Sequence, residues 1–276
     1  MKRSREVTIV SLEVIAEFHS WLFDHGKSQH TAKAYSTDLR MFLAATGTAT
    51  VLPDEFEDLG AAWLTRDRRK VAQKTTSRRL TSLRAFARWA GWGDVLGDYD
   101  APVAARAVPH PLPEGVEGVR RLIAATDVQQ RKCLIALCGL VGCRVGEALS
   151  IVPTSFETST MTLVIRGKGD KERRVPVSTE AWEILEKSVI RAFVAGTTVV
   201  NMQDRNARKV ITTLGLRAGL RRHISSHDLR ATFGTEVYNN TGDIRLVQEL
   251  LGHANVTQTE VYIGVSNTAM RKAVEL

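Results

Sequence analysis

Long hydrophobic runs are missing from this sequence of 276 residues. No stretch approaches the about 20 consecutive apolar residues that a membrane-spanning helix needs. The N-terminus starts with basic residues, but Glu13 and Glu17 interrupt what would be the apolar core of a signal peptide. We therefore expect a protein that is neither inserted in a membrane nor exported, and that acts in the cytoplasm.

Cysteine is also scarce, with only Cys133, Cys138 and Cys143. Their number is odd, they are five positions apart, and they form no C-x-x-C pair. This spacing fits neither a disulfide framework nor a zinc site. We expect three small buried side chains in a reducing compartment.

Acidic residues are nearly absent from residues 66–88, which hold nine Lys or Arg and one acid, Asp67. The whole chain carries a net charge of +8, and a basic balance favours a polyanionic partner. Apolar residues from Leu80 to Ala90 recur at helical spacing, so the basic side chains should lie largely off the apolar stripe. A solvated helix face is the alternative, although such faces usually mix charges of both signs. We predict contacts with DNA or RNA through Lys74, Arg78, Arg79, Arg84 and Arg88.

Proline is rare but unevenly distributed. Four of the seven prolines are Pro102, Pro109, Pro111 and Pro113. A proline-rich stretch of this kind is extended and is typical of a linker. It divides the chain into two predicted domains, residues 1–107 and 108–276.

Before the linker, the pattern of apolar and capping residues predicts an all-helical domain. The first helix ends near Gly26, and the second follows Ser28 as its N-cap and stops at Gly47. A third, shorter helix is expected over 56–67 and a fourth over 75–91.

After the linker, most of the chain is again helical, with one change of period. Residues 161–166 and 173–177 are β-rich on both sides of the turn 167–170, which predicts a β-hairpin. The predicted helices cover residues 116–126, 128–142, 144–151, 179–194, 201–222, 227–240 and 244–253.

Several side chains of the second domain could carry chemistry. Arg144 precedes a predicted helix, where a cation is unfavourable unless an anion also lies there. Lys168 lies at the hairpin tip, and His227 and Arg230 are three positions apart on one helix face. His253 and Tyr262 follow near the end of the chain. Each alone has an ordinary alternative: a surface charge, a solvated turn lysine, a polar pair on a helix, or a core tyrosine.

Taken together, these side chains suit one phosphodiester. Two arginines can fork onto its non-bridging oxygens and offset the charge of a phosphoryl-transfer transition state. A tyrosine hydroxyl can attack phosphorus as a covalent nucleophile, while histidine and lysine move protons. No carboxylates occur at metal-ligand spacing, as a two-metal nuclease would require.

The motifs that carry these residues resemble the tyrosine recombinase (phage integrase) family. The resemblance rests on "GCRVGEAL", "RGKGDKERRVPV", "SHDLRATFGT" and "LVQELLGHANVTQTEVYIGV", which occur in the family's order, and more weakly on "TAKAYSTDLRMFL" and "TTSRRLTSLRAFARW". It implies a mainly α fold with a small β-sheet. An N-terminal helical, SAM-like core-binding domain would precede a mixed α/β catalytic domain. Because helical periodicity begins near residue 8, the chain looks like the compact, Xer-like type without an N-terminal arm-binding domain.

The resemblance also assigns roles to the matching residues. Arg144 and Arg230 would hold the scissile phosphate, and Lys168 would protonate the 5′-hydroxyl leaving group. His227 would act as acid or base, His253 would donate to the phosphate, and Tyr262 would form the 3′-phosphotyrosine. Glu147 matches an acid that supports the site from behind these residues.

The same resemblance implies that neither a metal nor a cofactor takes part. The partner would be double-stranded DNA carrying a recombination site. One or two protomers would bind the half-sites and four would form the synaptic complex.

Two other functions stay open. A type IB topoisomerase uses similar chemistry to relax DNA, and a regulator could bind DNA on the same scaffold without catalysis. The conformation around Tyr262 is open as well. The β-branched alternation of residues 257–265 favours a strand, whereas the resemblance favours a short helix or turn. Integration, excision and dimer resolution all fit the sequence.

Overall fold

The computed structural model describes residues 7–67, 70–100, 110–167, 172–220 and 223–252. The chain forms two compact units, residues 1–106 and 107–276, and each has its own hydrophobic core. Within the described ranges, none of the helices is both long and apolar enough to cross a membrane.

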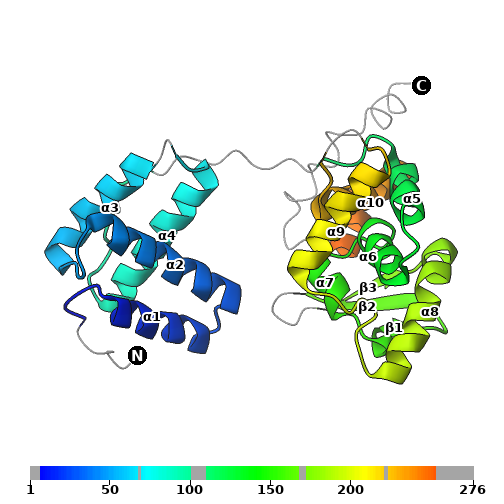
Figure 1. Cartoon of the computed structure of the whole chain (residues 1–276), viewed down its shortest axis with the longest axis horizontal. Coiled ribbons are helices and arrows are strands. Elements are labelled where there is room, and N and C mark those ends of the chain that lie inside the picture. Colours follow the sequence, from blue (N-terminus) through cyan, green and yellow to red (C-terminus); the bar gives the residue numbers. More distant parts are fainter. Residues whose placement is uncertain (1–6, 68–69, 101–109, 168–171, 221–222, 253–276) are drawn as a thin grey trace. The chain divides into compact units, whose positions relative to one another are not determined.

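The first unit is a bundle of helices (Figure 1). Its elements are α1 (Leu12–Asp24), α2 (Gln29–Thr46), α3 (Pro53–Asp67) and α4 (Gln73–Ala90). The predicted caps of α2 are confirmed, because the Ser28 hydroxyl accepts from the Thr31 N–H at 3.2 Å and Gly47 ends the helix with φ 75°. A left-handed φ of this kind suits glycine, which has no Cβ to clash.

Aromatic side chains fill the centre of this bundle. Phe18 and Phe86 meet edge to face with ring centroids 5.4 Å apart, and Phe42 and Phe56 do the same at 5.3 Å. All four rings are fully buried. Because α1, α2, α3 and α4 each contribute one of these rings, packing fixes the face that each helix turns inward.

The second unit is mixed α/β. Its helices are α5 (Gly115–Ala124), α6 (Gln129–Gly139), α7 (Val145–Ser150), α8 (Thr179–Ala195), α9 (Asp204–Arg217), α10 (Ser226–Thr241) and α11 (Ile244–Leu251), with a 3₁₀ turn, η1, at Pro153–Ser155. The strands β1 (Phe156–Glu157), β2 (Thr162–Arg166) and β3 (Glu172–Pro176) form an antiparallel sheet in that order. The predicted hairpin is confirmed, with Leu163 opposite Val175 and Arg166 opposite Glu172. The two-residue strand β1 was not predicted.

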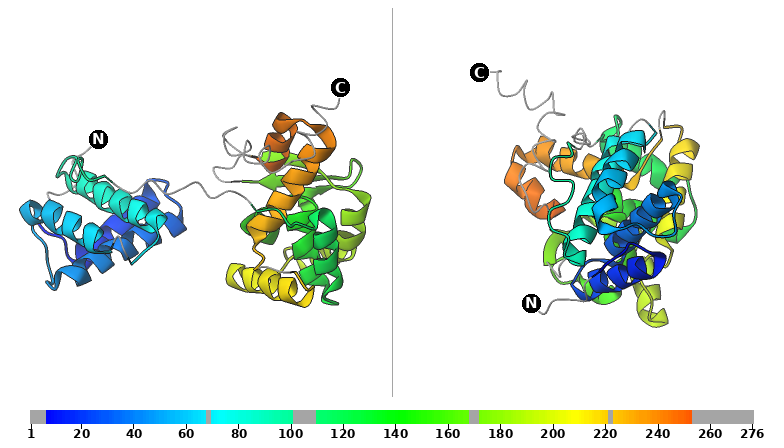
Figure 2. Two further views of the ribbon diagram at one scale, coloured as in Figure 1. Left: turned by 90° about the horizontal axis from the view of Figure 1, so that it is seen from above. Right: turned by 90° about the vertical axis from the view of Figure 1, so that its left-hand side faces the viewer.

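Helix α6 lies at the centre of this unit, and α5, α7, α8, α9 and α10 all contact it. Every residue from Cys133 to Gly139 is buried, as expected of a helix that is surrounded on all sides. Cys133, Cys138 and Cys143 are free thiols and all buried, which confirms the prediction made from their spacing. Helix α11 lies beside α10 and contacts β3 (Figure 2).

The fold class is therefore as predicted, mainly helical with one small sheet. The largest difference in a helix concerns α9, which was expected over 201–222 and spans Asp204–Arg217. Gly219, with φ 68°, follows soon after its end, where a left-handed glycine commonly terminates a helix.

Candidate active site

The turn between α6 and α7 places Arg144 at the start of α7. Gly142 in this turn has φ 76°, and a Cβ there would lie 2.4 Å from Cδ1 of Phe233, so only glycine fits. Arg144 is the N-cap of α7, where its positive charge opposes the helix dipole. The anion that this position requires is Glu147, whose Oε2 accepts from the Arg144 backbone N–H at 2.7 Å and whose Oε1 accepts from Nη1 at 2.7 Å.

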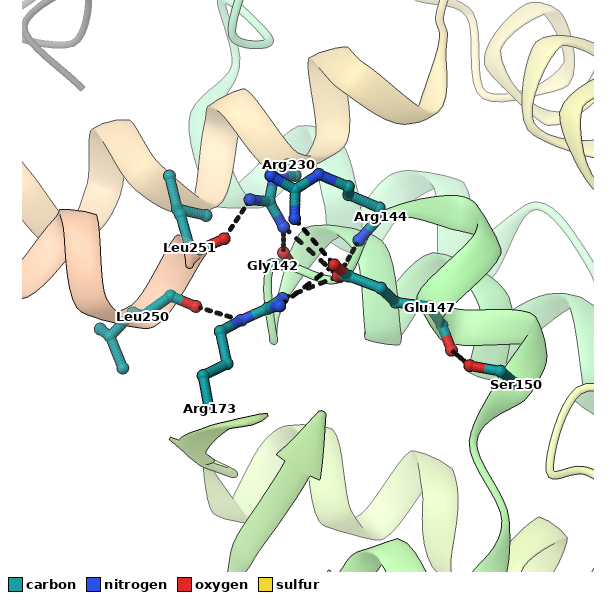
Figure 3. A network of polar contacts seen from close by, with 8 residues as sticks. All are labelled: Gly142, Arg144, Glu147, Ser150, Arg173, Arg230, Leu250 and Leu251. Carbon is teal, nitrogen blue, oxygen red and sulfur yellow. Dashed lines mark hydrogen bonds and ion pairs between the residues drawn. The ribbon is translucent and has the colours of Figure 1, made fainter. Parts of the chain in front are cut away.

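Arg173 on β3 also donates hydrogen bonds to the carboxylate of Glu147, from the side opposite Arg144 (Figure 3). Its Nη2 donates to Oε2 of Glu147 at 2.7 Å, and its Nη1 donates to Oε1 at 3.1 Å. This forked geometry is the strongest that arginine forms with a carboxylate. Arg173 was not among the site residues predicted from the sequence. The alternation of side chains along β3 could have indicated that Arg173 points inward, because it shares a strand face with the buried Val175.

Arg230 approaches Glu147 from α10. Its Nη1 lies 3.5 Å from Oε2 of Glu147 and donates to the carbonyl oxygen of Gly142 at 2.6 Å. Its Nη2 donates to the carbonyl oxygen of Leu251, the last residue of α11. Arg230 is thus only 4% exposed. Its contacts connect three parts of the unit: helix α10, helix α11, and the turn that precedes α7.

The three guanidinium groups and the carboxylate form one electrostatic cluster. Burial acts to raise the pKa of Glu147, but hydrogen bonds from Arg173 and Arg144 outweigh it and hold the pKa at about 2. Glu147 is therefore ionised at neutral pH, and three positive groups against one negative leave a net positive charge of two. The side chain of Arg144 is 41% exposed. Positive charge consequently reaches the surface at Arg144, where an anion can be bound.

His227 is exposed, one turn before Arg230 on α10. Desolvation lowers its pKa, and the charges of Arg208, Arg230 and Arg144 lower it further. The imidazole therefore favours the neutral form, which can accept a proton. Among the described residues, no three His, Cys, Asp or Glu side chains are grouped so that they could hold a metal ion.

Three predicted site residues, Lys168, His253 and Tyr262, lie outside the described residues. The structure does describe the elements next to two of them, Lys168 and His253. Strands β2 and β3 flank Lys168, and α11 ends one residue before Gly252, the neighbour of His253.

The basic face of α4 differs in part from expectation. Lys74 and Arg88 are exposed, as a phosphate contact requires. Arg78 donates to Oδ2 of Asp38 at 2.5 Å, and Arg84 donates to the carbonyl oxygens of Leu96 and Gly97, so both are half-buried.

The prediction that Arg79 lies off the apolar stripe, where it could face phosphates, is wrong. Its side chain is 4% exposed, pairs with Asp67 at 2.7 Å, and lies over the ring of Trp63 with 4.7 Å between the guanidinium carbon and the ring centroid. Such an arginine contributes packing and a cation–π contact to the core.

Comparison with known families identifies the class of this protein. The model of the phage integrase family matches residues 116–268, and that of the phage integrase N-terminal SAM-like domain matches residues 15–93. The chain belongs to the phage integrase family, and the resemblance that its sequence motifs indicated is confirmed.

The chain is also similar to tyrosine recombinases of the Xer type. The chain is 29% identical over 277 residues to tyrosine recombinase XerA of Thermococcus onnurineus, covering 95% of this chain and 94% of that one. It is 28% identical over 284 residues to tyrosine recombinase XerC of Chromobacterium violaceum, covering 95% and 93%.

A solved structure shares the fold. It is the XerH site-specific recombinase bound to palindromic difH substrate in a post-cleavage complex, with a TM-score of 0.66, 17% identity, and coverage of 96% of this chain and 95% of that one.

Proposed function

We propose that this protein is a site-specific recombinase that cleaves and rejoins DNA strands through a 3′-phosphotyrosine on Tyr262. The observation that carries the proposal is the convergence of Arg144, Arg173 and Arg230 on Glu147, in a chain of the phage integrase family. An ionised carboxylate holds the arginines in place, and their excess positive charge suits a phosphate that gains negative charge in the transition state.

In this proposal, Arg144 and Arg230 bind the non-bridging oxygens of the scissile phosphate. The phenolic oxygen of Tyr262 attacks phosphorus and the 5′-oxygen leaves, so one phosphoester bond replaces another and no ATP is consumed. The tyrosine proton passes to a base, for which the neutral His227 is suited. Lys168 protonates the leaving oxygen, and His253 donates to the phosphate. A 5′-hydroxyl of another strand then reverses the reaction.

The partner in this proposal is double-stranded DNA carrying a recombination site. The relative XerH was solved bound to a palindromic difH substrate, and exposed Lys74 and Arg88 on α4 supply charges for the DNA backbone. One or two protomers bind the half-sites, four form the synaptic complex, and the reaction takes place in the cytoplasm of a bacterium or a phage-infected host.

A nicked suicide substrate tests the proposal. The wild-type protein should form a covalent DNA adduct that is visible as a shifted band in a denaturing gel, and Tyr262→Phe should form none while binding DNA normally. No adduct from wild type would identify a non-catalytic binder, and an adduct from Tyr262→Phe would overturn the assignment of the nucleophile.

A second assay separates recombinase from topoisomerase. With the cognate sites on two DNA molecules, a recombinase exchanges the flanks crosswise, whereas a type IB topoisomerase only relaxes supercoils. Relaxation without exchange would favour the topoisomerase.

A further inference from the structure

We propose that Arg173 is a positioning residue for strand cleavage, which sets the end of α11 and hence the entry to the segment bearing His253 and Tyr262. The inference rests on the proposed function, because it concerns the same cleavage reaction. Arg173 joins three parts of the site: strand β3, on which it lies, Glu147 on α7, and the last turn of α11.

The contact of Arg173 with α11 provides a hydrogen-bond donor for a carbonyl group at the C-terminal end of this helix. The last carbonyl groups of a helix have no partner within it, and cations there also oppose the negative end of the helix dipole. Arg173 Nε donates to the carbonyl oxygen of Leu250 at 2.9 Å, and Arg230 donates to that of Leu251. Two arginines of one cluster therefore hold the two final residues of α11 (Figure 3).

Gly252 shows how closely Arg173 approaches the chain as it leaves the helix. A Cβ on Gly252 would lie 2.8 Å from Cδ and 3.2 Å from Nη1 of Arg173, and Gly252 has φ 60°. Its N–H bonds back to the carbonyl oxygens of Gln248 and Glu249, which closes the helix. Gly252, the last described residue before His253, is thus packed closely against the guanidinium group.

The contacts of Arg173 are to protein groups on two other elements. Its side chain is 10% exposed, and its Nε, Nη1 and Nη2 all donate to Leu250 or Glu147. It acts through the backbone of α11 and through Glu147, in contrast to the half-exposed Arg144.

The principal test compares Arg173→Gln with wild type in single-turnover cleavage of the suicide substrate at saturating protein. Displacement of reacting groups by about 1 Å costs on the order of 100-fold in rate, and we expect a loss of this order in adduct formation with unchanged DNA affinity. Peptides covering residues 244–252 should exchange amide hydrogens faster than in wild type, because the end of α11 loses its cation.

A modified substrate identifies which part of the site Arg173 positions. Sulfur in place of the bridging 5′-oxygen gives a leaving group that needs no general acid, and so bypasses Lys168 on the β2–β3 hairpin. We expect this substrate to leave the Arg173→Gln defect in place, because the fault lies at α11. Restoration of the wild-type rate would overturn the inference and assign Arg173 to the hairpin instead.

Two further variants keep the test decisive. Arg173→Lys retains a charge for Glu147 but lacks the fork that spans Glu147 and Leu250, so it should lose cleavage as well, even if Arg173→Gln does not fold. Arg174→Gln is the matched control, because Arg174 is its neighbour on β3, is 63% exposed and pairs with Glu157. It should cleave like wild type.

The outcomes separate the inference from the function on which it rests. If wild type forms no adduct, the proposed function fails. If wild type forms the adduct, and the folded variants Arg173→Gln and Arg173→Lys cleave as fast as wild type, the proposed function stands and the role of Arg173 is refuted. Loss of DNA affinity in step with cleavage would also refute it, because a positioning residue leaves binding intact.

Discussion

Glu147 is the residue on which the arginines of the site depend. It is nearly buried and accepts hydrogen bonds from the side chains of both Arg144 and Arg173. Buried carboxylates are tolerated when paired in this way, and removing one partner leaves an uncompensated charge. The negative charge on Glu147 is therefore needed to hold the arginines of the site in place.

Acid should weaken the protein through Glu147. Its folded pKa, about 2, is depressed from the ordinary 4.5, so the stability it contributes is present above pH 4.5 and is lost as pH falls toward 2. By linkage this amounts to on the order of 3 kcal/mol. Glu147→Gln should lower stability at pH 7 and flatten its pH dependence between 4.5 and 2 in urea unfolding. An unchanged pH dependence would contradict this.

Arg79 and Arg88 lie on one helix yet should respond oppositely to alanine. Arg79→Ala removes a buried cation from Asp67 and Trp63, and should cost about 2 kcal/mol of stability. Arg88→Ala should leave thermal unfolding unchanged and reduce the slope of log affinity for DNA against log salt by about 1. The reverse pattern would mean that Arg79 faces DNA.

The residues that sequence reasoning placed wrongly or missed share one physical property. Arg79 and Arg173 are charged, so composition alone favours a surface position. Their burial depends on partners in other elements. Arg79 contacts Asp67 and Trp63 of α3, and Arg173 contacts Glu147, 26 positions earlier, and Leu250, 77 positions later. Such pairs leave no local pattern. Arg144, by contrast, was recognisable from its place before a predicted helix, where a cation is unfavourable without an anion, and the acid that pairs with it lies three residues away.

Local capping and periodicity rules were sufficient to predict most of the helices. The second helix has Ser28 and Gly47 at its ends, and the hairpin begins and ends within one residue of its predicted bounds. The strand β1 escaped prediction because two residues have no period to detect. Its pairing with β2, Phe156 opposite Leu163, is a tertiary event.

The end of α11 offers a comparison of two glycines with nearly the same backbone angle. Gly252 has φ 60° and faces Arg173, whereas Gly196, at the end of α8, has φ 62° and no atom within 4 Å of the position that a Cβ would take. Alanine costs about 1–2 kcal/mol in this conformation at either site. Only Gly252→Ala should also slow adduct formation, as measured by single-turnover cleavage. Equal rates in both variants would show that the clash is relieved without consequence.

The two separate hydrophobic cores predict two unfolding events. The first core is rich in aromatic rings and the second is mostly aliphatic, and domains with their own cores can unfold separately. Calorimetry without DNA should show two transitions. Leu83→Ala should lower one and Leu137→Ala the other, since each removes a buried side chain worth about 2–5 kcal/mol. A shift of both by either variant would contradict this.

The three buried cysteines allow the opening of the second unit to be measured by thiol alkylation. All lie between Cys133 and Cys143, and burial raises the pKa of each thiol, that of Cys138 to about 12. Because the thiolate is the reactive form, an alkylating reagent should modify them only when this unit opens. The rate of labelling then reports the opening of the second unit alone, and DNA that binds its folded form should slow the labelling.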